Sequence, residues 1–281
     1  MAGGLNFGTG KAATIKVAKV LNCGGNGDIA SLVAGVMAVS DDAANDPTKP
    51  FILSMSLVGP DSPSMASAIN ELRATYHVIV TAAAGNSNID ACSGTPVNIA
   101  GVFGVGSVGP SDARSSFSNF GSCVEAYAPG EGVIGAWLNG GYASLSGTSM
   151  STPLVAGIFA QLLEQIGRTY PINGASNVSS SAVTIEQLAI NALMSQVFHP
   201  APLGGGALVY GSFDATQENN YGILPEGAPP QPLSNNPPPG PPPFSAPLLS
   251  QPNIHHANAA EFLNNPIGLV MLTLTLLIIL L

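Results

Sequence analysis

Residues 146–166 read SGTSMSTPLVAGIFAQLLEQI, and their second half repeats apolar side chains at helical spacing. One helix face collects Leu154, Val155, Ile158, Phe159, Leu162, Leu163 and Ile166. The pattern predicts a buried helix that starts close to Ser149 and ends near Gly167, with Pro153 tolerated in its first turn. Ser149 would then lie where unpaired backbone N–H groups and the helix dipole favour negative charge.

Two interpretations of Ser149 fit this position. A nucleophilic serine would gain from the helix N-terminus, because the negative charge of an acyl-transfer intermediate is stabilised there. An ordinary N-cap serine has the same place in the sequence, since serine is a preferred cap residue. The spacing alone leaves both interpretations open.

The residues before this helix alternate between short apolar runs and helical patterns. Strands are expected at residues 14–21, 51–57, 77–83 and 102–108. One helix is expected after the cap residue Asp28, with Ile29, Leu32, Val33, Val36 and Met37 on its buried face. A second is expected to start at Ser62 and Pro63, with Met65, Ala68, Ile69 and Leu72 facing inward.

This alternation predicts an α/β domain over residues 1–213, built on a parallel β-sheet with helices on both faces. Ligands of such sheets bind beyond the carboxyl ends of the strands, where residues 85–90 would lie.

Composition narrows the classes of partner. The net charge of −9 with only 7 Lys and Arg residues argues against a nucleic-acid partner. Cys23, Cys92 and Cys123 show no metal-binding spacing, so neither a metal site nor a cofactor is expected. The sequence is silent on structural calcium.

The C-terminal part differs in composition. Residues 214–265 are predicted to form a stalk, because 12 of the chain's 24 prolines fall between residues 225 and 252. Residues 266–281 are apolar and are expected to anchor the protein to a membrane, which places it at the cell surface or outside the cell. A glycosylphosphatidylinositol signal around residues 258–260 is one interpretation, a tail-anchored helix a second, and an unstructured apolar end a third.

Two motifs carry a resemblance to a known family. The run from Ser146 to Gly157 is similar to the nucleophile segment GTSMAxPHVAG of the subtilisin-like serine peptidases, from which Ser151 and Leu154 depart. AAAGN at residues 82–86 resembles the family's AAGN. The resemblance implies a subtilisin-like fold, hydrolysis of polypeptide substrates, Ser149 as nucleophile and Asn86 as oxyanion donor.

Further matches extend this resemblance. Residues 54–59, SMSLVG, resemble the SLGG substrate edge, which implies substrate binding by Ser56, Leu57, Val58 and Gly59, with Ala84 and Gly85 opposite. RSSFSNFG at 114–121 and AYAPG at 126–130 resemble the proteinase K-like branch. That branch implies a disulfide between Cys92 and Cys123.

The family's catalytic aspartate and histidine have no counterpart in the 281 residues. Both precede these motifs in the family, and Met1 to Gly3 correspond to the end of its HGTHVAG motif. Cys23 resembles a cysteine whose partner also lies in that earlier part. The sequence therefore predicts a domain incomplete at its N-terminus and, as written, inactive, because none of the histidines (His77, His199, His255 and His256) stands where a base would.

Three functional hypotheses remain. The first is a cell-surface serine endopeptidase, and the second is a non-catalytic cell-surface binding protein with the same domain. The third is a sedolisin-like peptidase, which uses a Glu and Asp pair with a similar SGTS serine. Asn86 and Met150 favour the subtilisin-like hypothesis over the third.

Overall fold

The computed structural model describes residues 1–4, 6–22, 25–137, 140–169, 185–195, 207–208, 255–256 and 276–280. Cys23 and His199 lie outside these residues. Of the predicted stalk, residues 214–265, only residues 255–256 are described. Of the predicted anchor, residues 266–281, only residues 276–280 are described. The account below concerns the described residues.

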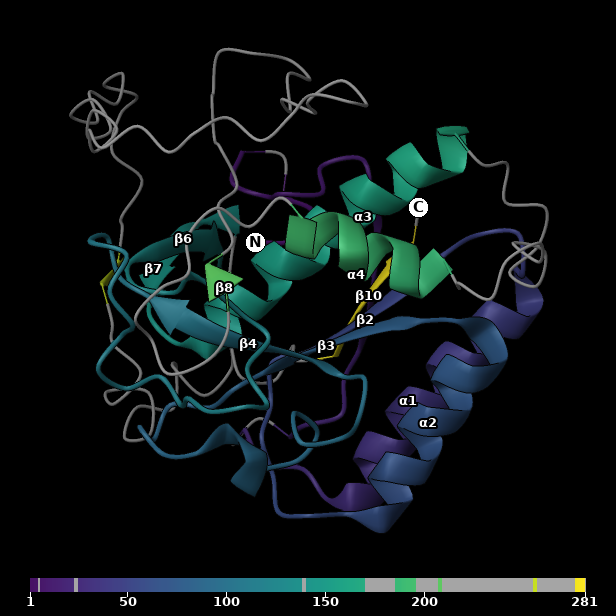
Figure 1. Cartoon of the computed structure of the whole chain (residues 1–281), viewed down its shortest axis with the longest axis horizontal. Helices are drawn as coiled ribbons and strands as arrows, with labels where there is room; N and C mark the ends of the chain where they lie inside the picture. Colours follow the sequence, from purple (N-terminus) through teal and green to yellow (C-terminus); the bar gives the residue numbers. More distant parts are fainter. Residues whose placement is uncertain are drawn as a thin grey trace.

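A seven-stranded sheet forms the centre of the domain (Figure 1). Its order is β1 (Thr14–Ala18), β10 (Leu276–Leu280), β2 (Phe51–Met55), β3 (Ile79–Ala83), β4 (Phe103–Val108), β5 (Ala126–Pro129) and β8 (Ala207–Leu208). From β2 to β8 every neighbouring pair is parallel, whereas β10 is antiparallel to both β1 and β2. A smaller sheet contains β6 (Val133–Ala136), β7 (Tyr142–Leu145) and β9 (His255–His256).

Helices cover both faces of the large sheet, as predicted (Figure 1). On one face lie α1 (Ile29–Asn45) and α2 (Pro63–Tyr76); on the other lie α3 (Thr148–Thr169) and α4 (Ile185–Ser195). A short 3-10 helix, η1 (Ala91–Ser93), follows the loop after β3. Asp28 and Ser62 cap α1 and α2 by accepting hydrogen bonds from Ser31 N–H and Met65 N–H, so both predicted helix starts are confirmed.

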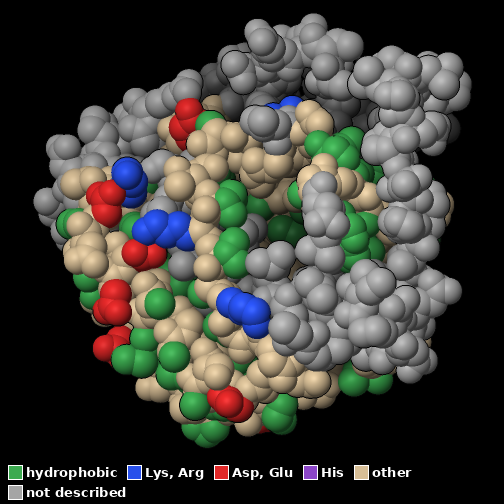
Figure 2. Space-filling model, turned by 180° about the vertical axis from the view of Figure 1, so that it is seen from behind, with side chains coloured by type: hydrophobic (Ala, Val, Ile, Leu, Met, Phe, Trp, Pro, Cys, Tyr) green, Lys and Arg blue, Asp and Glu red, His purple; other side chains and the backbone are tan. Residues whose placement is uncertain are grey.

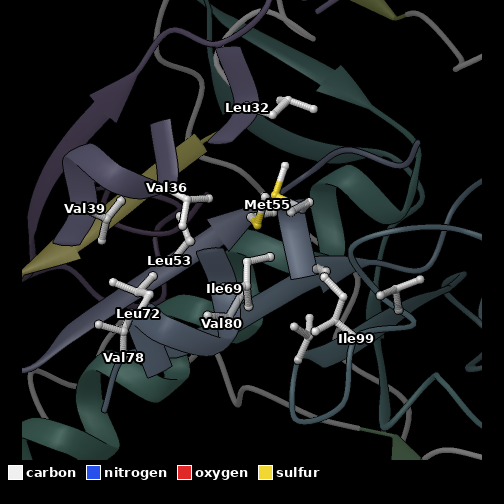
Figure 3. Close-up of a cluster of buried hydrophobic side chains, with 14 of the residues drawn as sticks. Leu32, Val36, Val39, Leu53, Met55, Ile69, Leu72, Val78, Val80 and Ile99 are labelled. Atoms are coloured by element: carbon white, nitrogen blue, oxygen red, sulfur yellow. The ribbon is translucent and has the colours of Figure 1, made fainter. Parts of the chain in front are cut away.

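The large sheet has a hydrophobic core on each face, because neighbouring strand residues point to opposite faces. Leu53 and Val80 face α1 and α2 and join the first core, which Figure 3 shows. Ile52 and Ile79 face α3 and join the second core with Phe159. Every residue of β2 and β3 is buried, which explains their continuous apolar sequences.

Several predicted boundaries are wrong. The first strand ends at Ala18 rather than at residue 21, and the second ends at Met55 rather than at residue 57. His77 belongs to no strand, because it closes α2 in the left-handed conformation, with φ of 53°. Met37 lies on the solvent side of α1 with 59% of its surface exposed, so it is not part of the predicted buried face.

Charged side chains are sparse on the described surface. On the face in Figure 2 the few Lys and Arg side chains are scattered, and some of them lie next to Asp or Glu side chains. The described residues include no cluster of His, Cys, Asp or Glu side chains suited to hold a metal ion. No helix within them has both the length and the apolarity to cross a bilayer.

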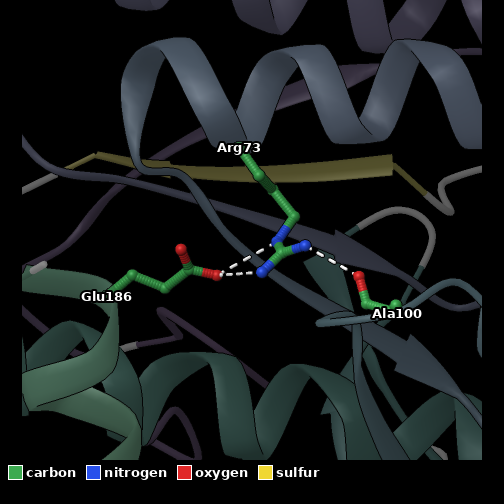
Figure 4. A network of polar contacts seen from close by, with 3 residues as sticks. All are labelled: Arg73, Ala100 and Glu186. Atoms are coloured by element: carbon green, nitrogen blue, oxygen red, sulfur yellow. Dashed lines mark hydrogen bonds and ion pairs between the residues drawn. The ribbon is translucent and has the colours of Figure 1, made fainter.

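A partly buried ion pair joins helices on opposite faces of the sheet. Arg73 of α2 donates from Nε and Nη2 to Glu186 of α4, at 3.0 and 2.8 Å, and from Nη1 to the Ala100 carbonyl at 2.8 Å (Figure 4). The two side chains are only 20% and 10% exposed. Loss of either partner would leave a charge that water reaches poorly.

We expect Arg73→Met to lower the free energy of unfolding by about 2–3 kcal/mol, because it leaves the Glu186 carboxylate without its cation. The double variant Arg73→Met/Glu186→Met should recover most of that loss. Lys49→Met is the matched control, since its pair with Asp46 is exposed, and it should cost less than about 1 kcal/mol. Urea unfolding followed by circular dichroism measures all three; equal losses for Arg73→Met and Lys49→Met would contradict the expectation.

Glu125 carries the one large pKa shift among the described residues. Burial beside β4 raises the pKa of its carboxyl to about 7, although a hydrogen bond of 2.5 Å from Gly104 N–H favours the charged form. The native state therefore holds the Glu125 proton more tightly than the unfolded state over the pH range between the ordinary pKa of 4.5 and the raised pKa of about 7.

This shift predicts that the Glu125 contribution to stability is full below pH 4.5 and is lost as the pH rises to about 7. Glu125→Gln keeps an acceptor for Gly104 N–H and removes the titration. The variant should therefore gain stability relative to the parent as the pH rises through this window, and the difference should level off above it. Urea unfolding at pH 4 to 8 gives the difference; a pH-independent one would contradict the shift.

Candidate active site

Ser149 lies in the first turn of α3, directly after the smaller sheet. The chain leaves β7 at Leu145 and enters the helix at Thr148 through Gly147, which has a φ of 152°. Thr148 N–H donates to Asn86 Oδ1 at 2.9 Å, so Asn86 supplies the side-chain acceptor for the helix start. Ser149 is the second residue of the helix, and the N-cap interpretation is therefore wrong.

The Ser149 hydroxyl is turned toward the end of β2. Ser149 Oγ donates to the Ser56 carbonyl at 3.4 Å, and Ser56 Oγ donates to the Ser149 carbonyl at 3.0 Å. These two reciprocal bonds join the candidate nucleophile to the predicted substrate edge. Ser149 is half-buried, so its hydroxyl is held in place and still accessible.

Pro153 explains one of the two bonds. It lies inside α3, four residues after Ser149 and thus beyond the predicted first turn. A residue at this position would normally donate its N–H to the Ser149 carbonyl, but proline has no N–H. The Ser56 hydroxyl fills that role instead.

Asn86 is oriented by the same helix start. Its amide oxygen accepts from Thr148 N–H and from Thr148 Oγ1 at 3.0 Å, and only oxygen can accept these bonds. The NH₂ group therefore faces the turn at Gly147, where an added Cβ would lie 3.3 Å from Asn86 Nδ2. This arrangement places an amide donor at the turn before Ser149. The role of Asn86 as an oxyanion donor stays a prediction.

Asn119 positions the Asn86 loop, and the sequence did not single it out. This buried side chain donates to the Ala84 carbonyl at 2.8 Å and accepts from Ser87 and Ile89 N–H at 2.9 and 3.2 Å. Gly85 has a φ of 104°, and a Cβ there would lie 2.4 Å from Asn119 Nδ2. The only signal in the sequence was the asparagine of the RSSFSNFG run, and its role depends on contacts with residues 30 to 35 positions away.

The predicted substrate edge is partly used by the protein itself. Gly59 exchanges two backbone hydrogen bonds with Thr95, at 2.7 and 2.9 Å. Val58 is 46% exposed and lies between two glycines, because a Cβ on Gly94 or Gly85 would stand 2.6 or 3.6 Å from its methyl carbons. Substrate pairing along residues 56–58 stays a prediction.

A disulfide closes the other side of the Asn86 loop. Cys92 and Cys123 are joined with a Cα–Cα distance of 5.3 Å, as the resemblance implied. Backbone hydrogen bonds from Asn88 to Phe117 and between Ile89 and Phe120 tie the same two segments together. The loop that carries Asn86 is thus fixed at both ends.

A proton acceptor for Ser149 does not occur among the described side chains around it. Of the four histidines, only the side chain of His77 is described, and it lies before β3, whereas Asn86 follows β3. The five residues of β3 separate these ends by roughly 15 Å. The backbone of His255 and His256 pairs with Ala143 and Ser144 in the smaller sheet.

Comparison with known proteins identifies the family. The subtilase family profile matches residues 1–222. The chain is 39% identical over 196 residues to alkaline serine exoprotease A of Vibrio alginolyticus, and 36% identical over 181 residues to proteinase R of Parengyodontium album. These matches cover 68% and 64% of this chain but only 36% and 46% of those proteins.

A solved structure shows the same fold. The crystal structure of a cold adapted subtilisin-like serine proteinase superposes with a TM-score of 0.57 at 37% sequence identity. That match covers 69% of this chain and 66% of the other. The chain belongs to the subtilase family and has its α/β fold, and it spans less than half the length of the two curated relatives above.

The hydrogen bond from the Ser56 hydroxyl to the Ser149 carbonyl replaces the missing Pro153 N–H, and mutations can test this replacement. We expect Ser56→Ala to lower the free energy of unfolding by about 1–2 kcal/mol, because the Ser149 carbonyl loses its partner. In a Pro153→Ala background the helix regains the missing N–H, so Ser56→Ala should cost clearly less.

Urea unfolding of the four members of this double-mutant cycle measures the coupling. Ser67→Ala, on the exposed side of α2, is the matched serine control and should change stability by less than about 0.5 kcal/mol. An identical cost of Ser56→Ala in both backgrounds would mean that Ser56 does not substitute for the proline.

Proposed function

We propose that this domain provides the nucleophile and the oxyanion donors of a serine endopeptidase. Ser149 Oγ attacks the scissile carbonyl of a polypeptide, while the Asn86 NH₂ and the Ser149 backbone N–H hold the resulting oxyanion. The Ser149 N–H has no acceptor within α3, because the helix begins only one residue earlier. The convergence of Ser149 and Asn86 on one helix start carries the proposal.

The proposal requires a base and an acid in addition to these residues. A serine hydroxyl is a weak nucleophile until a neighbouring base removes its proton, and members of a catalytic triad act as a unit. The Ser149 hydroxyl instead donates to the Ser56 carbonyl, which cannot accept a proton during catalysis. The 281 residues by themselves are therefore proposed to be inactive.

A chimera tests the proposed activity. The part of Vibrio alkaline serine exoprotease A that precedes its matched region would be fused ahead of Met1. The chimera should hydrolyse peptide anilides, Ser149→Ala should abolish this hydrolysis, and the 281-residue chain alone should show none. A folded chimera that lacks activity, or activity that survives Ser149→Ala, would contradict the proposal.

Asn86 variants in the chimera separate two roles of this residue. Asn86→Ala should lower kcat by about 100- to 1000-fold, a range taken from subtilisin itself, which makes it a family value and not an independent estimate. It should also destabilise α3, since Thr148 N–H loses its acceptor. Asn86→Asp keeps that acceptor and removes the donor, so stability should be retained while kcat falls at least as far.

A second candidate function is peptide binding without hydrolysis. It is favoured by one observation: Ser56 and Asn86 both contact the start of α3, while the described side chains offer Ser149 no base. An extended peptide amide would then bind to the 281-residue chain, as measured by calorimetry, and remain uncleaved. If the chain alone binds the peptide and the chimera does not, the peptide binds at a site other than the candidate active site.

The proposed location is extracellular. A relative that is 37% identical over 182 residues is named extracellular serine proteinase, from a Thermus strain, and the Cys92–Cys123 disulfide is typical of oxidising compartments. Polypeptides are the proposed substrates, and neither nucleic acid nor a cofactor is proposed. Anchoring through residues 266–281 stays a prediction, and it competes with the position of Leu276–Leu280 in the sheet.

A further inference from the structure

Two segments of the chain leave the large sheet side by side near Ser149. β2 and β3 are parallel neighbours, so residues 56–59 and 84–90 both follow the carboxyl ends of paired strands. Ser56 of the first segment bonds to Ser149, and Asn86 of the second contacts the start of the same helix. Ligands of parallel sheets bind beyond such strand ends. A substrate side chain would therefore enter between these two segments.

Val58 takes up the space between the two segments. Its Cγ2 lies 3.6 Å from the point where a Cβ on Gly85 would stand, and its Cγ1 lies 2.6 Å from the corresponding point on Gly94. Its methyl groups therefore approach the facing loop at bare backbone. Val58 is 46% exposed, so these methyl groups are open to a ligand. The SLGG motif has a glycine at this place, whereas this chain has an isopropyl group.

The conformation of Gly94 indicates that its lack of a side chain makes room for Val58. Gly94 has a φ of −131° and a ψ of 148°, an extended backbone that every residue type can adopt. The nearest atom to a Cβ there is a methyl carbon of Val58. Gly85 is different, because its φ of 104° and the Asn119 amide exclude a side chain whether Val58 is present or not. Val58 is thus the side chain that determines how much room remains.

Hydrolysis fixes where the substrate residue before the cleaved bond must lie. Its carbonyl carbon has to reach Ser149 Oγ, and its carbonyl oxygen has to reach the Asn86 NH₂ group. Gly85, which Val58 contacts, directly precedes Asn86. Ser56, which bonds to Ser149, is two residues before Val58. The side chain of that substrate residue is therefore brought to the place that the Val58 methyl groups occupy.

We propose that Val58 limits the substrate residue on the acyl side of the cleaved bond to glycine or alanine. The inference rests on the proposed function and adds a substrate class to it. A hydrogen atom or a methyl group fits beside the Val58 methyl groups, whereas the side chains of leucine and phenylalanine overlap with them. Such overlap is costly, since a single methylene in a fitted apolar pocket already changes kcat/KM by about 10- to 200-fold.

Peptide anilides that differ only in this residue test the limit in the chimera described above. The value of kcat/KM should be higher for alanine than for leucine or phenylalanine by roughly 100-fold or more. Val58→Gly removes the isopropyl group, so it should raise the ratio of kcat/KM for phenylalanine over alanine by roughly 100-fold or more. Val58→Ala should give an intermediate ratio.

Val58→Thr is the matched control. Threonine has the branching of valine and nearly its volume, so this variant should keep the parent's preference for alanine. Val58→Ala separates space from backbone freedom, because alanine does not gain the flexibility of glycine. The preference should therefore follow side-chain volume across the four residue types at this position.

The outcomes separate this inference from the proposed function. Ser149-dependent hydrolysis with equal kcat/KM for alanine and phenylalanine would keep the proposed function and overturn the role of Val58. A ratio that Val58→Gly leaves unchanged, or a preference that Val58→Thr abolishes, would also overturn it, because size would not be the cause. If the folded chimera and its Val58→Gly variant cleave none of the anilides, the proposed function fails and the inference fails with it.

The place of Val58 is also testable in the 281-residue chain, without catalysis. Gly94→Ala should lower the melting temperature by roughly 2–10 °C, because the new methyl group stands against Val58 Cγ1. In a Val58→Gly background the same substitution should cost clearly less. Equal losses in the two backgrounds would show that Val58 does not occupy this space and would overturn the proposal.

Discussion

The reciprocal hydrogen bonds between Ser56 and Ser149 connect the two halves of the candidate site. One bond exists because Pro153 leaves the Ser149 carbonyl without its helical donor, so the hydroxyl of Ser56 takes that place. The other holds the Ser149 hydroxyl at the end of β2. Pro153 thereby helps to hold Ser149 against the end of β2, where a substrate would pair. The two hydrogen bonds join the sheet to α3 at this point.

The remaining parts of the site depend on the same junction. Asn86 reaches the start of α3 by accepting from Thr148, and this contact aligns its NH₂ group with the turn before Ser149. The loop that carries Asn86 is held by Asn119 and by the Cys92–Cys123 disulfide. Such fixed donors suit oxyanion stabilisation, because they need no rearrangement as charge develops.

The sequence predicted the layers and the helix starts at Asp28 and Ser62, since these depend on local periodicity and caps. The two family motifs come together as well, because Asn86 contacts Thr148 at the start of the helix that carries Ser149. The sequence missed Asn119 and the role of Ser56 toward Pro153, because these rest on contacts between residues 30 to 93 positions apart. The strand at Leu276–Leu280 was missed for a further reason: a short, continuous apolar run suits a membrane and a buried strand equally.

The central proposal is that Ser149 is positioned as a nucleophile while the described side chains around it offer no base. Treatment with a fluorophosphonate probe tests it, because the Ser149 oxygen must lose its proton to displace fluoride from phosphorus. Mass spectrometry of the peptide that contains Ser149 should find it unmodified after the 281-residue chain is treated. Stoichiometric modification of Ser149 that is absent from Ser149→Ala would contradict the claim and would show that a base lies within the chain.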